Sequence, residues 1–349
     1  MDDHQTPNSE RGLGCGVTVT DTHHRDNDRT TKYSVRVDVS DEVKLSNTYI
    51  AATVIAPRQV SRRPIIAAAF PGGGYSRGYF DIQWPGGYSE AEYHADGGWL
   101  FIAIDHLGVG ESSLPDPALL TFECMANANA AATQAIVSCL RSGTLFHSLG
   151  PLERPFVIGV GQSMGGCVSI VTQAMHRPFD ALAVLGYSAS HTVLPSPTGG
   201  VQVSAIERGR TDTAGIVSEA EEVGDVEVFA WAFHFDDVDP GVRHEDLRGG
   251  FPFRTQGVPA WGSATLPPAA ASMLAPDVVA EEAAAVDVPV LIGVGERDVC
   301  PDPWAEPASY RNARQVSLCV VPRMAHMHNF ASSRQELWTR IHRWGESLS

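Results

Sequence analysis

The hydrophobic residues of this chain fall mainly into short continuous runs, with longer mixed stretches between them. A run of five or six apolar residues without polar alternation is typical of a strand covered on both faces, as in a parallel sheet. Stretches with a helical pattern lie between several runs, which predicts alternating strands and helices. The runs are residues 65–70, 99–104, 156–160, 181–185, 290–294 and 316–321, and the clearest predicted helices are residues 125–140, 167–175 and 334–344.

Two further strands are predicted ahead of these runs. Polar and apolar residues alternate over 33–39, and β-branched residues precede Pro57 over 49–55. The whole pattern predicts a mostly parallel α/β sheet of about eight strands flanked by helices. Residues 1–31 are polar and show no apolar period, so we expect a mobile N-terminal arm there.

The alternation of strands and helices stops over residues 191–286. This stretch carries an acidic run at 218–225 and a segment rich in Pro, Gly and Ala at 249–276. It is too long for a loop inside a compact domain. We therefore expect a cap, inserted after the sixth strand, between two parts of an α/β core at 32–190 and 287–349.

Composition narrows the class of partner. A net charge of −16 argues against binding to nucleic acid or to an anionic membrane surface, so we expect a small-molecule substrate and leave a homo-oligomer open. The six cysteines are scattered without a C-x-x-C pair, and we expect them to be reduced. With no recognisable signal peptide or membrane span, this predicts a cytoplasmic protein.

The pattern G-x-S-x-G occurs twice, around Ser76 and around Ser163. The first match lies in a glycine-rich turn that no helix follows. The second directly follows the predicted strand at 156–160 and precedes the predicted helix at 167–175. A serine on such a strained strand-to-helix turn has its hydroxyl lifted clear of the sheet, as a nucleophile requires. Ser163 is therefore the predicted nucleophile.

A serine hydroxyl is a weak nucleophile until a base takes its proton. His326 and His328 follow the last predicted strand and precede the final predicted helix. We expect His326 to be the base, because it comes first off the strand and follows the small Ala325. Only one residue separates the two histidines, so loop geometry decides between them and His328 is the alternative base.

The base in turn needs an acceptor that holds its tautomer and stabilises the imidazolium. Asp298 lies four residues beyond the predicted strand at 290–294. The carboxyl ends of parallel strands meet at one edge of a sheet, which is also the edge that carries Ser163. Asp298 is therefore the predicted acid, with Glu296 and Asp302 as rivals.

A tetrahedral intermediate needs backbone N–H donors for its oxyanion. One donor is expected from Met164, the residue after the predicted nucleophile. The other is expected from the loop at residues 71–75, which reads PGGGY; we assign Gly73 first and Gly74 as the alternative. This loop resembles the HGGG loop of lipases and esterases, with Pro71 in the place of the histidine.

Aromatic residues gather in the predicted cap at Phe229, Trp231, Phe233 and Phe235. The first three, together with Tyr75 of the glycine-rich loop, are candidate substrate contacts. The alternative is that the cap aromatics form the cap's own hydrophobic core.

Together these features resemble the α/β-hydrolase superfamily over residues 33–190 and 287–349. Residues 105–112, DHLGVGES, look like the turn after the fourth strand of that family. Its nucleophile, acid and histidine follow one another in the chain order predicted above. The resemblance implies the α/β-hydrolase fold and a serine hydrolase, but it does not extend to the cap and so does not identify the substrate. We expect hydrolysis of a carboxylic ester or lactone of a small, apolar substrate through an acyl-enzyme, with no metal and no cofactor. The alternatives are carbon–carbon or amide hydrolysis or acyl transfer by the same residues, and a non-catalytic binding protein of the fold.

Overall fold

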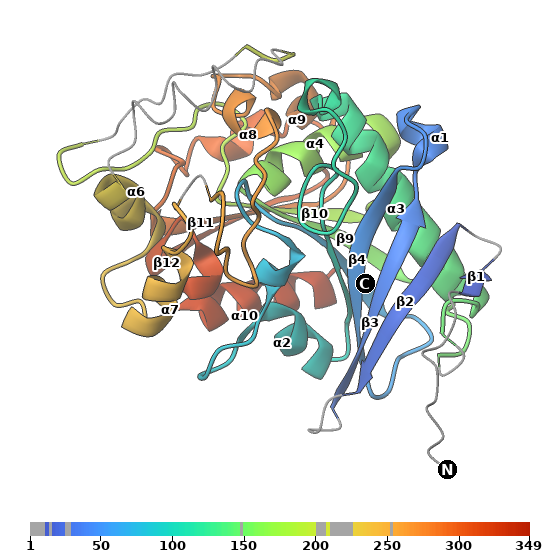
Figure 1. The fold of residues 1–349 in the computed structure, drawn as a ribbon. Coiled ribbons are helices and arrows are strands. Elements are labelled where there is room, and N and C mark those ends of the chain that lie inside the picture. The colour runs from blue at the N-terminus through green and yellow to red at the C-terminus, as the bar shows by residue number, and fades with distance from the viewer. Residues whose placement is uncertain are drawn as a thin grey trace.

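The predicted apolar runs lie side by side in one sheet. The computed structural model describes residues 11–13, 16–24, 29–146, 149–199, 207–209, 226–251 and 254–349. Within them, the strands are β1 (Arg11–Leu13), β2 (Val17–His24), β3 (Thr30–Asp38), β4 (Tyr49–Pro57), β5 (Ile65–Phe70), β6 (Asp81–Ile82), β7 (Tyr88–Ser89), β8 (Leu100–Ile104), β9 (Phe156–Gln162), β10 (Ala181–Leu185), β11 (Val290–Arg297) and β12 (Val316–Ala325). The main sheet has ten of them, in the order β1-β2-β3-β4-β8-β5-β9-β10-β11-β12 (Figure 1). Neighbours from β1 to β8 in this order are antiparallel, and those from β8 to β12 are parallel.

Helices cover both faces of the parallel part of the sheet. They are α1 (Ser40–Val43), α2 (Glu90–Asp96), α3 (Phe122–Ser142), α4 (Met164–His176), α6 (Val226–Phe233), α7 (Pro240–Asp246), α8 (Ala269–Ser272), α9 (Ala280–Ala285) and α10 (Arg334–Glu346), with 3₁₀ turns η1 (Arg77–Phe80), η2 (Pro117–Leu119), η3 (Glu306–Ser309) and η4 (His328–Phe330). In β5, Ile66 and Phe70 join the core formed with α3 and α4, whereas Ala67 and Ala69 join a second core formed with α2 and α10. Successive strand residues point to opposite faces, so burial on both faces requires an unbroken apolar run. The prediction of a mostly parallel α/β sheet is confirmed.

The sheet has more strands than the eight expected, because β1 and β2 lie within the predicted mobile arm at residues 1–31. β2 pairs antiparallel with β3, so that Val17 lies opposite Val37, and Val17 is fully buried. The prediction of a mobile arm is therefore wrong for residues 17–24. Valine and threonine alternate in this segment, so one face of the strand is apolar. The alternation was not recognised because the surrounding residues are mostly polar. Residues 1–10 lie outside the described part of the chain.

The chain between β10 and β11 forms helices that do not belong to one layer. α6 and α7 lie at one edge of the molecule, near the ends of β11 and β12 (Figure 1). By contrast, α9 packs against α4, and Val279, Ala283 and Val286 belong to the main hydrophobic core. The cap predicted for residues 191–286 therefore extends too far, because its last helix presents an apolar stripe to the sheet layer. The acidic run at 218–225 lies outside the described residues.

The state of the cysteines also differs from the expectation. Cys139 in α3 is disulfide-bonded, whereas Cys124, Cys167, Cys300 and Cys319 are free thiols. The prediction that all six cysteines are reduced is therefore wrong, and one reason for expecting a cytoplasmic protein is lost. No helix in the described residues combines the length and hydrophobicity needed to cross a membrane.

Candidate active site

Ser163 lies on the sharp turn between β9 and α4. Its φ of 53° is one that L-residues rarely adopt, and its N–H donates to the carbonyl of Leu185 at 2.8 Å. A Cβ on Gly165 would lie 2.0 Å from the carbonyl oxygen of Phe70, and a Cβ on Gly161 would lie 2.4 Å from the carbonyl oxygen of Gly165. Glycine at these two positions therefore allows α4 to begin this close to the sheet, with Ser163 on the strained elbow.

His326 follows β12 and contacts both of the residues that were predicted to accompany it. Its Nε2 lies 3.0 Å from Oγ of Ser163, and its Nδ1 lies 2.8 Å from Oδ1 of Asp298. An ionised carboxylate accepts hydrogen bonds only, so the Nδ1–H donates to Asp298. In the neutral ring this tautomer leaves the Nε2 lone pair facing the Ser163 hydroxyl.

Asp298 is a buried carboxylate with a donor at each lone-pair position. Oδ1 accepts from His326 and from the Val299 N–H at 2.8 Å, while Oδ2 accepts from His328 Nε2 at 2.7 Å and from the Gly295 N–H at 2.9 Å. Burial alone would raise the pKa of Asp298. The electrostatic attraction and hydrogen bonds of His328 and His326 outweigh burial and hold this pKa well below its usual range. Asp298 is therefore ionised at neutral pH.

His328 binds the far oxygen of this carboxylate and makes no hydrogen bond to Ser163 within the described structure. Both histidine rings pack over Gly186, where an added Cβ would lie 3.3 Å from His326 Nδ1 and 3.3 Å from His328 Nε2. The arrangement places His326 between Ser163 and Asp298, and it places His328 behind Asp298.

The rival carboxylates are engaged elsewhere. Glu296 accepts from the N–H of Arg323 at 2.8 Å, and its side chain is on the exposed end of β11. Asp302 accepts from the N–H groups of Trp304 and Ala305, each at 3.2 Å, and so closes its own turn. Neither of them has a hydrogen bond to His326 among the described residues.

The glycine-rich loop between β5 and η1 lies against Ser163. The Tyr75 N–H donates to the Gly72 carbonyl at 3.2 Å, and Gly74 has a φ of 77°, as the third residue of a type II turn requires. A Cβ on Gly72 would lie 3.1 Å from Cβ of Ser163. The hydrogen bond of the turn uses neither the Gly73 N–H nor the Gly74 N–H, which are the two predicted oxyanion donors in this loop.

His106 holds the start of this loop, a role that the sequence did not suggest. Its Nε2 lies 3.1 Å from the Pro71 carbonyl oxygen, and the side-chain amide of Asn129 donates to its Nδ1 at 3.0 Å. The ring is fully buried, and burial lowers the pKa of His106 to about 4 against the smaller opposing effect of these hydrogen bonds. The only signal for it was its place in the turn at residues 105–112.

Apolar side chains of the inserted segment lie against His326 and against the glycine-rich loop. The Phe233 ring centre lies 4.9 Å from that of His326. Leu266 and Ala270 lie over the glycine-rich loop, since a Cβ on Gly73 would lie 3.0 Å from each of them. These three side chains are apolar groups that the insertion places next to His326 and the glycine-rich loop.

The other aromatic candidates lie elsewhere. Trp231 and Phe235 contact the guanidinium of Arg297, at 3.8 Å and 4.7 Å from their ring centres. Phe229 is buried in a small cluster within the insertion. Tyr75 is 1% exposed, and its hydroxyl donates to a buried aspartate, so its phenol is not available to a substrate. Phe229 packs edge-on against Phe233, with ring centres 5.8 Å apart, and of the four candidate contacts Phe233 is the one beside His326.

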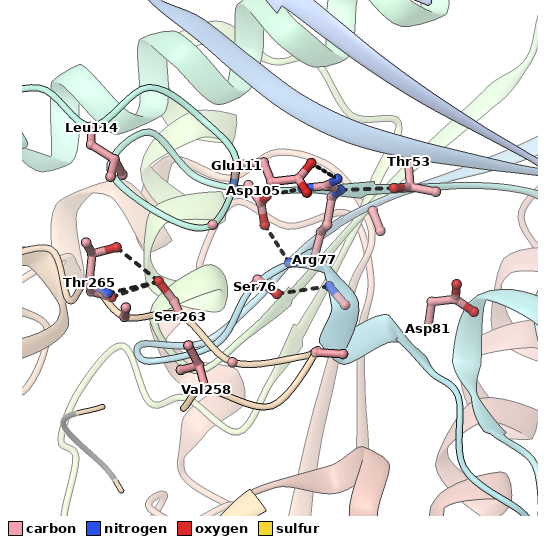
Figure 2. A pocket seen from close by; sticks show the side chains of 16 residues that line it. Thr53, Ser76, Arg77, Asp81, Asp105, Glu111, Leu114, Val258, Ser263 and Thr265 are labelled. Carbon is pink, nitrogen blue, oxygen red and sulfur yellow. Dashed lines mark hydrogen bonds and ion pairs between the residues drawn. The ribbon is translucent and has the colours of Figure 1, made fainter. Parts of the chain in front are cut away.

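The second G-x-S-x-G match has a structural place. Oγ of Ser76 accepts from the Gly78 N–H at 3.3 Å and caps η1. Ser76 lines a cavity of about 440 Å³ in which Arg77 is paired with Asp105 and with Glu111, the latter at 2.6 Å (Figure 2). No histidine lines this cavity in the described part of the chain, so nothing there serves as a base for Ser76.

Comparison with known proteins bears on the fold. No protein-family model matches this sequence, and a search of curated proteins gives no match. Many solved structures do match. Among them are an esterase from Thermogutta terrifontis with malate bound (15% identity, TM-score 0.55, 87% of this chain and 96% of that one), a proline iminopeptidase from Mycobacterium smegmatis (16%, 0.54, 87% and 96%), and an enol-lactonase from Burkholderia xenovorans LB400 (15%, 0.55, 86% and 98%). The chain has the α/β-hydrolase fold.

In this α/β-hydrolase fold, the loops after β9, β11 and β12 meet at one edge of the parallel sheet. They bring together Ser163, Asp298 and His326, which lie far apart along the chain. Within the described residues, no group of three or more His, Cys, Asp or Glu side chains is placed to hold a metal ion. The sequence also missed Asp246 and Arg254, two buried charges close to the glycine-rich loop, because isolated charged residues in an insertion carry no motif.

Proposed function

We propose that this protein is a serine hydrolase that cleaves a carboxylic ester or a lactone through a covalent acyl-enzyme. The observation that carries the proposal is the hydrogen-bond chain from Ser163 through His326 to Asp298. A base within reach of a serine hydroxyl, oriented by a buried carboxylate, is the arrangement that activates such a hydroxyl. The strained elbow beneath Ser163 supports the same assignment.

The reaction follows from the roles of these atoms. His326 Nε2 takes the hydroxyl proton as Oγ of Ser163 attacks the substrate carbonyl carbon. The tetrahedral intermediate collapses, and the leaving alkoxide receives that proton from the imidazolium; in a lactone it stays attached to the acyl chain. His326 then removes a proton from water as the water attacks the acyl-enzyme carbonyl. When the second tetrahedral intermediate collapses, the imidazolium gives this proton to Oγ of Ser163, and the acid is released. Asp298 stays ionised and stabilises the imidazolium in both halves.

The oxyanion is assigned to backbone donors. Met164 follows the nucleophile at the first turn of α4, where N–H groups have no partner within the helix. Gly73 is the donor from the glycine-rich loop, with Gly74 as the alternative. The contact between this loop and Ser163 supports the assignment, and such a donor contributes about 10²–10³-fold to kcat.

The walls beside Ser163 favour a small, apolar acyl group. Phe233, Leu266 and Ala270 are apolar, and the residues Ser163 and His326 are nearly buried, at 5% and 4% exposed. A buried apolar wall gains from acyl methylene groups at about 0.8 kcal/mol each. Substrate preference should therefore rise with acyl length and then stop where the acyl chain fills the space.

A fluorophosphonate probe tests the nucleophile. Labelling should disappear in Ser163→Ala and remain in Ser76→Ala, the matched control from the second G-x-S-x-G match. Ester hydrolysis should fall by about 10⁴-fold or more in Ser163→Ala. Labelling lost in Ser76→Ala but kept in Ser163→Ala would overturn the proposal.

A substrate panel tests the bond class. It should hold acyl esters of graded length and lactones, with amides, vinylogous diketones and acceptor alcohols beside them. Turnover of esters or lactones well above the others is expected. Turnover restricted to amides or diketones would move the same three residues to another reaction.

A further inference from the structure

A second buried carboxylate lies close to the proposed active site. Asp246, at the end of α7, is fully buried and accepts four side-chain hydrogen bonds. Oδ1 accepts from Arg254 at 2.8 Å and from the Trp261 indole at 2.7 Å. Oδ2 accepts from the Tyr75 hydroxyl at 2.8 Å and from His234 Nε2 at 2.9 Å. Every lone-pair position of this carboxylate is therefore occupied.

These contacts keep Asp246 charged. Burial would raise the pKa of Asp246, but the hydrogen bond from His234, the charge of Arg254 and the other donors lower it below its usual value. Removing one partner from such a buried ion pair is strongly destabilising, whereas apolar replacement of the whole pair is often neutral. Stability alone therefore does not require charged residues here.

The network reaches the glycine-rich loop directly. Arg254 Nη1 donates to the Gly74 carbonyl at 2.7 Å, and the Ser263 N–H donates to the same oxygen at 2.9 Å. Arg254 also stacks over the Tyr75 ring, 4.7 Å from its centre. The carbonyl of Gly74 is thus held from two sides, which sets the orientation of the type II turn against Ser163.

The same inserted segment also holds the histidine loop. The His326 N–H donates to the Ala232 carbonyl at 3.2 Å, and the Met327 N–H donates to the Phe233 carbonyl at 3.0 Å. These acceptors lie at the end of α6, directly before His234, which binds Asp246. One buried network therefore connects the loop that carries the proposed oxyanion donors to the loop that carries the proposed base.

We propose that Asp246 and Arg254 are positioning residues that orient the N–H groups of Gly73 and Gly74 toward the oxyanion. The inference rests on the proposed function. Neither charge touches the substrate; they act through the Gly74 carbonyl and the Tyr75 hydroxyl. Their loss should therefore reduce stabilisation of the transition state and leave substrate binding nearly unchanged.

The substitution Arg254→Lys tests this role. Lysine keeps the positive charge beside Asp246 but lacks the planar fork that reaches both Asp246 and the Gly74 carbonyl. We expect kcat to fall about 10- to 100-fold, with KM changed by less than about threefold and fluorophosphonate labelling slowed in parallel. The matched control is Arg334→Lys, which should leave kcat unchanged. Like Arg254, Arg334 is buried, stacks on a tyrosine ring and donates to backbone carbonyls, but these carbonyls lie away from the glycine-rich loop.

The outcomes separate positioning from stability. A purely structural role predicts a lower Tm and an unchanged kcat below it, and this result would overturn the inference. If Arg254→Lys does not fold, Trp261→Phe removes one donor from Asp246; an unchanged kcat in that variant would equally overturn it. Failure of the proposed function is a separate result, namely an active Ser163→Ala variant.

Discussion

His106 offers a test of how burial beside the glycine-rich loop makes the fold sensitive to acid. Its ring is fully buried, donates to the Pro71 carbonyl and accepts from Asn129. The substitution His106→Gln keeps one donor and one acceptor in the side chain but removes the group that titrates. Comparing the two proteins therefore isolates the proton that His106 takes up on unfolding.

The sign follows from the two states. Above pH 6.5 the ring is neutral whether the chain is folded or unfolded. Between pH 6.5 and about 4, His106 is protonated in the unfolded chain but stays neutral in the folded protein. Unfolding therefore takes up a proton, and the free energy of unfolding falls as the pH falls. Below about pH 4 both states carry the proton and the loss stops. A pKa lowered from 6.5 to about 4 corresponds to about 3 kcal/mol at 1.36 kcal/mol for each pH unit.

Urea unfolding between pH 4 and pH 8 measures this loss. The free energy of unfolding of the wild type, relative to that of His106→Gln, should fall by about 3 kcal/mol from pH 7 to pH 4. All other titratable groups are shared, so their contributions cancel in the difference. A difference that stays constant with pH, or one that grows in favour of the wild type at low pH, would refute the reasoning.

Three other substitutions test the site. His328→Leu removes a donor from the buried carboxylate and should lower kcat about tenfold, since a hydrogen bond to a charged group contributes about 1.5–3 kcal/mol; a loss near 10⁴-fold would instead make His328 the base. Phe233→Ala should raise KM for long-chain esters more than for acetates, by about 1–3 kcal/mol of lost contact, while Trp231→Ala should change both equally or not at all; the reverse pattern would place Trp231 in the pocket. Gly165→Ala, whose Cβ would lie 2.0 Å from a backbone oxygen, should lower the free energy of unfolding by about 3 kcal/mol or more in urea titrations, and Gly150→Ala, with nothing within 4 Å, should not; equal stability of the two variants would contradict the close packing of the elbow.

Local pattern was sufficient for the strands of the parallel sheet. The run at residues 65–70 became β5 without a change of bounds, because burial on both faces leaves no position for a polar side chain. The hydrophobic pattern did not predict β2, because only one face of this strand is apolar and the segment around it is rich in polar residues. It also failed at the end of the insertion, since α9 differs from a cap helix only in what it packs against.

The chemistry of the site divides in the same way. The elbow around Ser163 could be predicted from the sequence because its strand, its glycines and its helix follow one another directly in the chain. The need for glycine at 161 arises from Gly165 within the same turn, whereas the need for glycine at 165 arises from Phe70 of β5 and is visible only in the structure. The sequence did not decide between His326 and His328, because both lie on one loop. Which of them contacts Ser163 depends on where β12 ends relative to β9 and β11. The structure sets them on opposite oxygens of Asp298.

The contacts of the buried charged residues in the insertion could not be predicted from the sequence. Asp246 gathers donors from the glycine-rich loop, from α6 and from residues 254 and 261, segments that no local pattern connects. The parallel strands and the strand-to-helix turn that carries Ser163 could be predicted from the sequence alone, because hydrophobic periodicity and turn motifs involve residues that are close together in the chain. Only the tertiary structure decided which charges meet, since a hydrogen bond depends on angstrom-scale distances, and Tyr75 and Asp246, for example, lie 171 positions apart in the chain.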